Sequence, residues 1–138
     1  MNWFASYHYV FVHFPIALII MAGIAELMMA IRKEIALDKT VIFLLGYTAV
    51  FILFTIATGL TLEDVVAVGE QNHDNLEWHE TFAYITLFLV FATLILRVWK
   101  GKNVLYLTFL ILLVSSVTIT AHFGGVMAFG PLQFIPSL

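Results

Sequence analysis

Five histidines are the residues of this sequence best suited to chemistry: His8, His13, His73, His79 and His122. Imidazole is the commonest protein ligand for metal ions, and it also binds haem iron. The 138-residue chain contains no cysteine, which excludes disulfides, thiolate metal sites, iron–sulfur clusters and the covalent attachment of c-type haem. The sequence therefore indicates metal or haem chemistry carried by imidazole.

The composition requires membrane helices to position these histidines. Hydrophobic residues make up 62% of the chain and charged residues only 11%, and the mean hydropathy is +1.03. Soluble domains carry about 25% charged residues, so a soluble globule is excluded. The net charge of −3 and the lack of a basic cluster exclude a nucleic-acid partner.

Four segments are apolar enough to cross a bilayer, which takes ~20 residues. They run from Phe11 to Ile31, from Val41 to Leu62, from Thr81 to Leu96 with a start near Leu76, and from Val104 to His122. Because the connections are short, consecutive helices should be antiparallel neighbours. We predict an all-α, integral membrane four-helix bundle with up-down topology, formed by residues 1–138 as one domain without internal repeats.

The distribution of charge predicts the orientation of this bundle. All six basic residues lie in or beside the first and third connections: Arg32, Lys33, Lys39, Arg97, Lys100 and Lys102. The middle connection is acidic instead. By the positive-inside rule, both basic connections are cytoplasmic and both termini are extracytoplasmic.

The same topology places the histidines at the extracytoplasmic boundary. His13, His79 and His122 each lie within about a turn of that boundary on three different helices, given a rise of ~1.5 Å per residue. We expect these three imidazoles to converge inside the bundle, as cofactor ligands of helix bundles do. His8 would point about 140° away from His13 on a continuous helix, unless the chain bends at Pro15.

Small and hydroxyl residues near these histidines predict a surface for a bulky, flat ligand. Gly124 and Gly125 would let the backbone approach such a ligand closely. Ser115, Thr118 and His122 share one helical face, His79, Ala83 and Thr86 share another, and the second helix offers Thr55, Thr58 and Gly59. Thirteen phenylalanines are available for an apolar wall. The alternative is that these faces only pack helices and that the histidines are interfacial anchors.

Two further polar residues have a simpler interpretation. His73 lies between Asn72 and Asp74 and is expected to be solvated. Glu26 lies inside the first helix, where a carboxylate is costly unless it is paired or protonated. It predicts either a proton or quinone site near the cytoplasmic side, or an interior hydrogen bond or ion pair with Arg97.

Four stretches of the sequence resemble one known family. The segment HYVFVHFPIAL, from His8 to Leu18, resembles the opening of a bacterial family of predicted membrane proteins, a domain of unknown function that reads approximately H-P-x-x-V-H-F-P-I-A-L. TGL at Thr58–Leu60 and LEWHE at Leu76–Glu80 follow, the latter similar to an L-x-x-H-R element. TAHFGG at Thr120–Gly125, with the later Gly130, is similar to the closing motif G-H-x-G-G-x-x-x-x-G.

The resemblance implies a function on the extracytoplasmic side of a bacterial inner membrane. The family histidines correspond to His8, His13, His79 and His122, and in some bacteria the domain is fused to c-type cytochrome modules, which implies redox work. The chain departs from the pattern at Tyr9, where the family has proline, and at Glu80, where it has arginine. The second departure removes a cation that would have suited a haem propionate.

The leading hypothesis is a b-type cytochrome subunit of a larger respiratory or photosynthetic complex, an electron carrier rather than a stand-alone enzyme. Haem b would be bound non-covalently by imidazoles of two helices, His13 with His79 or His122, and the number of haems stays open. The partners would be the lipid bilayer and other redox subunits, such as an extracytoplasmic c-type cytochrome.

Two alternatives belong to other classes of protein. Imidazoles with Glu77 or Glu80 would form a non-haem site for zinc, copper or iron, although the HEXXH motif of metalloproteases is absent because the sequence reads HETFA from His79. A small structural or assembly subunit of a membrane complex would need no cofactor.

Overall fold

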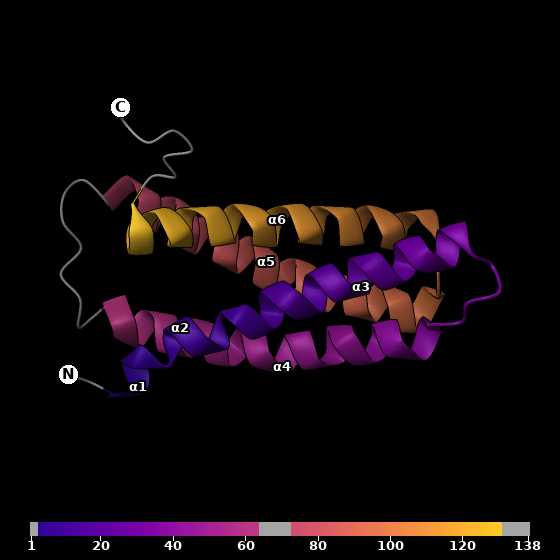
Figure 1. The fold of residues 1–138 in the computed structure, drawn as a ribbon, viewed down its shortest axis with the longest axis horizontal. Helices are drawn as coiled ribbons and strands as arrows, with labels where there is room; N and C mark the ends of the chain where they lie inside the picture. The colour runs from indigo at the N-terminus through magenta and orange to yellow at the C-terminus, as the bar shows by residue number, and fades with distance from the viewer. Residues whose placement is uncertain (1–2, 64–72, 131–138) are drawn as a thin grey trace, which may run out of the picture.

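The computed structural model describes residues 3–63 and 73–130, and within these ranges the chain forms α-helices (Figure 1). Their bounds are α1 Trp3–Ser6, α2 His8–Phe11, α3 His13–Ile31, α4 Asp38–Glu63, α5 His73–Lys100 and α6 Val104–Phe129. Four spans are long and apolar enough to cross a membrane, and α1 to α3 together make up the first of them. The all-α prediction and the number of membrane helices are confirmed.

The observed helices are longer than the apolar segments of the sequence. In particular, α5 begins at His73 and α6 continues to Phe129, beyond the predicted starts and stops. Apolar composition marks only the part of a span that needs hydrocarbon around it, whereas backbone hydrogen bonding extends the helix into more polar surroundings.

The helices form two antiparallel hairpins that pack side by side. The first hairpin consists of α1 to α4 and the second of α5 and α6, and packing within each is more extensive than packing between them, along the α3–α6 and α4–α5 seams. The described chain starts and finishes at the same end of the bundle (Figure 1). We call this the histidine end, because His8, His13, His79 and His122 lie toward it, and the opposite end the basic end.

A proline explains the broken start of the first span. Pro15 is buried in the first turn of α3, and because proline has no N–H it cannot bond to the carbonyl of Phe11, four residues earlier. The Thr55 hydroxyl of α4 lies 3.2 Å from that carbonyl and 2.9 Å from the carbonyl of Phe51 in its own helix, so its one proton serves both acceptors. The short helices α1 and α2 thereby lie against α4, and Pro15 stands near the beginning of the main helix.

Each long helix contributes to a common apolar core. Ile19, Leu45, Val90 and Leu113, one from each helix, are fully or almost fully buried. Large apolar side chains such as Phe88 and Ile111 are instead exposed on the outside of the bundle. Such a surface is unfavourable in water and is what a bundle presents to lipid.

Candidate functional site

The imidazole of His8 is held against α4. Its Nδ1 lies 3.0 Å from the backbone oxygen of Thr55 and 3.3 Å from the Thr58 hydroxyl. The ring also lies directly over Gly59, where an added Cβ would be 3.0 Å from the His8 Cε1 atom. A side chain at position 59 would therefore push the ring away from the carbonyl to which it bonds.

His79 is held against α6 in the same way. Its Nδ1 lies 2.9 Å from the backbone oxygen of Thr120, and an added Cβ at Gly124 would be 3.0 Å from its Cε1 atom. The acceptor threonine and the glycine under the ring are four residues apart in both helices. The sequence analysis found no internal repeat, but Thr-x-x-x-Gly occurs at 55–59 and at 120–124 and marks one histidine contact in each hairpin.

This geometry determines which ring nitrogen is available. A backbone carbonyl only accepts hydrogen bonds, so Nδ1 of each ring carries the proton and donates it, and Nε2 keeps its lone pair. Such a carbonyl bond to the far nitrogen is the usual way in which metal-binding histidines are oriented. Thr55 and Thr120, whose carbonyls accept these two bonds, line the same cavity between the helices.

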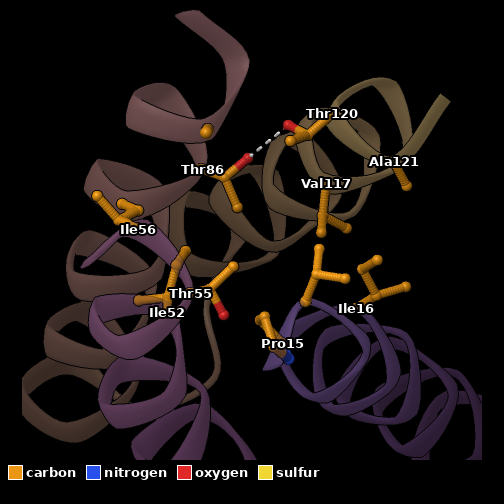
Figure 2. Close-up of a pocket in the computed structure, with 11 residues that line it drawn as sticks. Pro15, Ile16, Ile52, Thr55, Ile56, Thr86, Val117, Thr120 and Ala121 are labelled. Atoms are coloured by element: carbon orange, nitrogen blue, oxygen red, sulfur yellow. Dashed lines mark hydrogen bonds between the residues drawn. The ribbon is translucent and has the colours of Figure 1, made fainter. Parts of the chain in front are cut away.

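A small cavity of about 40 Å³ lies between the two hairpins near these histidines. All four long helices line it, with Pro15 and Ile16 from α3, Thr55 from α4, Thr86 from α5, and Val117 and Ala121 from α6 (Figure 2). The Thr86 hydroxyl is 2.8 Å from that of Ser116 and 3.4 Å from that of Thr120. The cavity is therefore bordered by apolar groups and a few satisfied hydroxyls.

The structure places His13 and His122 differently from His79. Both side chains are exposed. The Nδ1 atom of His13 lies 2.6 Å from the backbone oxygen of Tyr9, in the preceding turn, and the ring of His122 contacts the neighbouring Phe123, with 5.7 Å between centroids. The expected convergence of His13, His79 and His122 inside the bundle is thus not what the geometry shows, and the half-buried histidines are His8 and His79.

The rotation of each helix explains this difference. The buried face of α3 includes Pro15, Ile19 and Glu26, and His13 is not on it. The buried face of α6 includes Ser116 and Thr120, with His122 turned away. Ring placement thus depends on which face of each helix packs inward.

The residues that were predicted to line a ligand on α6 also differ in whether they face inward or outward. Ser115 and Thr118 are exposed, and the Thr118 hydroxyl bonds to the carbonyl of Val114 in its own helix. Gly124 touches the His79 ring, whereas a Cβ at Gly125 would meet nothing within 4 Å. The sequence analysis missed Ser116 and Thr120, which lie on the inward face of α6.

The faces predicted on the other two helices do point inward. Thr55, Thr58 and Thr86 are buried, while Ala83 and Gly59 are half-buried. His73, which was expected to be solvated, is exposed at the start of α5. Among residues 3–63 and 73–130, no group of three or more histidine, cysteine, aspartate or glutamate side chains could hold a metal ion.

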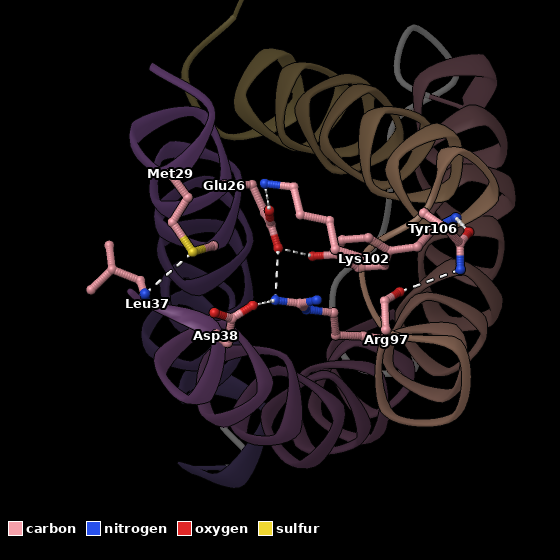
Figure 3. A network of polar contacts seen from close by, with 9 residues as sticks. Glu26, Met29, Leu37, Asp38, Arg97, Lys102 and Tyr106 are labelled. Carbon is pink, nitrogen blue, oxygen red and sulfur yellow. Dashed lines mark hydrogen bonds and ion pairs between the residues drawn. The ribbon is translucent and has the colours of Figure 1, made fainter. Parts of the chain in front are cut away.

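Glu26 belongs to a second polar cluster, at the basic end (Figure 3). Its carboxylate accepts a hydrogen bond of 2.9 Å from the Tyr106 hydroxyl, lies 3.4 Å from the Arg97 guanidinium, and lies 2.8 Å from the Lys102 ammonium. Arg97 also pairs with Asp38. The predicted pairing of Glu26 with Arg97 is confirmed, and its alternative, a proton or quinone site, is not needed to explain this buried carboxylate.

The tight connection between α5 and α6 makes this cluster possible. Gly101 takes a positive φ of 64°, which glycine adopts without steric cost, and the Asn103 side chain caps α6 by accepting from the backbone N–H of Tyr106 at 2.9 Å. The Arg97 guanidinium carbon also lies 5.1 Å from the centroid of the Tyr106 ring. The cluster contains two acidic and two basic side chains and is neutral overall, which lowers the cost of burying it.

Comparison with known proteins identifies a family but no characterised relative. The sequence matches the family described as Predicted membrane protein (DUF2231) over residues 5–131. No curated protein matches the chain, and no solved structure matches it. The match covers all four membrane-spanning helices and both histidine contacts, and the chain therefore belongs to the DUF2231 family of predicted membrane proteins.

Proposed function

We propose that this protein is a membrane b-type cytochrome subunit whose haem b is held between the two hairpins by His8 and His79. The observation that carries the proposal is the repeated arrangement of the two imidazoles. Each donates its Nδ1 proton to a threonine carbonyl, at 3.0 Å for His8 and 2.9 Å for His79, so each keeps Nε2 for a metal. A haem iron needs only these two ligands from the protein.

The residues around the two rings fit this role. The carbonyls of Thr55 and Thr120 would hold the imidazoles in one orientation and increase their basicity. Gly59 and Gly124 leave the space that each ring occupies. Haem supplies one-electron transfer when it is bound, and two histidine ligands leave no coordination position for a substrate, which favours an electron carrier over a catalytic enzyme.

The proposed pair differs from the pair expected from the sequence. His13 and His122 are exposed, so neither is the natural partner of the half-buried His79. The absence of a three-ligand cluster among the described residues also disfavours a non-haem zinc, copper or iron site, since such sites usually take three or four protein ligands. A two-ligand haem site has no such requirement.

The positive-inside rule supports an orientation for this subunit. It would place the basic end in the cytoplasm, and the histidine end with both termini on the extracytoplasmic side of a bacterial inner membrane. Asp74 and Glu77 are exposed near the start of α5. An acidic surface there would suit a basic extracytoplasmic redox partner, such as a c-type cytochrome, by charge complementarity.

An optical spectrum of the purified protein tests the proposal. Protein expressed with a haem supply should bind one haem per chain and show the paired visible bands of low-spin haem after reduction. His8→Ala and His79→Ala should each abolish these bands, while His73→Ala, which changes an exposed histidine, should keep them. Colourless protein with a stoichiometric metal would instead favour a non-haem site, and colourless protein without metal would favour a structural subunit.

A further inference from the structure

The polar contacts of this fold divide sharply between its two ends. At the histidine end, the side-chain hydrogen bonds between described residues stay within one hairpin: His8 and Thr55 bond inside the first, and His79, Thr86 and Ser116 bond inside the second. Among the described residues, the hydrogen bonds and ion pairs that cross from one hairpin to the other lie at the basic end.

Between residues that the structure describes, the polar contacts that cross from one hairpin to the other involve the cluster around Glu26. Glu26 of the first hairpin contacts Arg97, Lys102 and Tyr106 of the second, and Asp38 of the first pairs with Arg97 of the second (Figure 3). Glu26 and Arg97 are both buried, at 4% and 5% exposure. Buried charges of this kind resist separation, because breaking the pair leaves a charge without a partner in an apolar environment.

The hairpins meet at the histidine end through apolar contacts and the cavity of about 40 Å³. That cavity is far too small for a macrocycle. A planar ligand bound by both His8 and His79 must therefore lie between the hairpins and move them apart. Within a membrane this costs little, because lipid tails can replace the apolar contacts that are lost.

The α3–α6 seam is the side on which the hairpins can separate. Of the two seams between the hairpins, the packing of α3 on α6 is less extensive than the packing of α4 on α5. The short helices α1 and α2 pack against α4. On α6, Ala121 is only partly buried, and space is open around the Cβ position of Gly125.

From these observations we infer that the two hairpins act as a clip. The Glu26–Arg97 cluster is the hinge at the basic end, and a planar, membrane-soluble ligand enters sideways from the bilayer between α3 and α6. This inference rests on the proposed function for the identity of the ligand, which is haem. Once bound to His8 and His79, the ligand itself becomes the link between the hairpins at the histidine end.

The packing of α3 on α6 provides matched positions for a test. A Cβ at Gly23 would be 3.4 Å from a Val114 methyl group, so these two residues face each other. Two turns toward the histidine end lie Ile16 and Ala121, which line the same cavity. About one turn toward the basic end lie Leu27 and Ile111, which are both exposed. The chain has no cysteine, so engineered cysteine pairs report on these positions alone.

The first measurement needs no ligand. Spin labels on the pair Ile16→Cys/Ala121→Cys should give a broader distance distribution by double electron–electron resonance than labels on Leu27→Cys/Ile111→Cys. Adding Glu26→Gln should broaden the second distribution as well, because it weakens the hinge. Equally narrow distributions for both pairs in the otherwise unchanged protein would overturn the clip.

The second measurement uses haemin as the probe. Oxidising the Ile16→Cys/Ala121→Cys pair to a disulfide should slow haemin uptake at least ten-fold, and reduction should restore it. Oxidising a Gly23→Cys/Val114→Cys pair instead, whose positions face each other two turns nearer the basic end, should slow uptake less than oxidising the first pair does. If the Ile16→Cys/Ala121→Cys variant binds haemin as fast when oxidised as when reduced, the proposed entry between α3 and α6 is wrong. If the natural protein binds no haemin, but the spin labels at Ile16→Cys and Ala121→Cys still give a broad distance distribution, the haem proposal fails and the clip stands.

Discussion

The Cε1 atom of His79 lies 3.0 Å from the place where a Cβ of residue 124 would be. The imidazole of His79 therefore packs directly on the backbone at Gly124, and the imidazole of His8 packs in the same way on Gly59. Both rings reach a carbonyl that lies one turn before the glycine in the same helix. This close approach is the physical reason for glycine at two positions near the histidine ends of α4 and α6.

If His8 and His79 bind haem as proposed, Gly59→Ala and Gly124→Ala should each weaken haem binding by about ten-fold or more, about 1.4 kcal/mol, because the added methyl group displaces one of the two imidazoles. A haemin titration followed by absorbance would measure this change. Gly46→Ala and Gly125→Ala are the matched controls, since a Cβ at either position meets nothing within 4 Å. In a helix these two changes should be neutral or stabilising by up to about 1 kcal/mol. An equal loss of haemin affinity in all four variants would contradict the role assigned to Gly59 and Gly124.

Thr55→Val should destabilise the N-terminal segment. The Thr55 hydroxyl bonds to the Phe11 carbonyl, which Pro15 leaves without its helical donor. Removing this donor should cost about 1–3 kcal/mol of the free energy of unfolding in detergent, and it should loosen His8. Thr61→Val is the control, because the Thr61 hydroxyl bonds only to carbonyls of its own helix. A smaller loss of unfolding free energy for Thr55→Val than for Thr61→Val would argue against a stabilising hydrogen bond from Thr55 to the Phe11 carbonyl.

Arg97→Met should reduce the free energy of unfolding by about 3–5 kcal/mol, because it leaves the buried Glu26 with less compensation. Adding Glu26→Met should recover part of that loss, since the double variant buries neither charge. Denaturant titration of the two single variants and the double variant gives the coupling directly. Additive losses would show that the two side chains do not act as a pair. Lys39→Met, at an exposed position, should change stability little.

The orientation of the bundle can be measured with single cysteines, because the natural chain has none. A membrane-impermeant thiol reagent applied to intact cells should label Asp74→Cys, at the exposed start of α5, and should not label Glu34→Cys, in the exposed first connection. Permeabilised cells should label both. Labelling of Glu34→Cys alone in intact cells would reverse the orientation given by the positive-inside rule.

Much of the fold could be predicted from the sequence. Four apolar stretches and short connections are local properties, and they suffice for four membrane helices, as the structure has them. The pairing of Glu26 with Arg97 was also predictable, because few residues within reach of a buried carboxylate can compensate its charge. His79 and Gly124 were chosen as ligand-binding candidates from residue type and from their place near the end of a span; the structure brings them into contact, and their binding of a cofactor stays a prediction.

The choice of the inward histidine could not be predicted in this way. Neighbouring residues of an α-helix point about 100° apart, so a small rotation changes which side chains face the core. On α6 it separates the exposed Ser115 and Thr118 from the buried Ser116 and Thr120. On the first span, the packing of α1 and α2 against α4 turns His8 inward, while His13 stays outside.

The sequence by itself determined that this is a membrane bundle, which of its ends is basic, and that its histidines gather toward the other end, because composition and charge are sums over local segments. Only the tertiary structure decided that His8 and His79, rather than His13 and His122, are half-buried and bonded to another helix, and that the hairpins are tied together at the basic end. Those features depend on the rotation and the mutual packing of helices that are far apart in the chain, and no local property of the sequence specifies them.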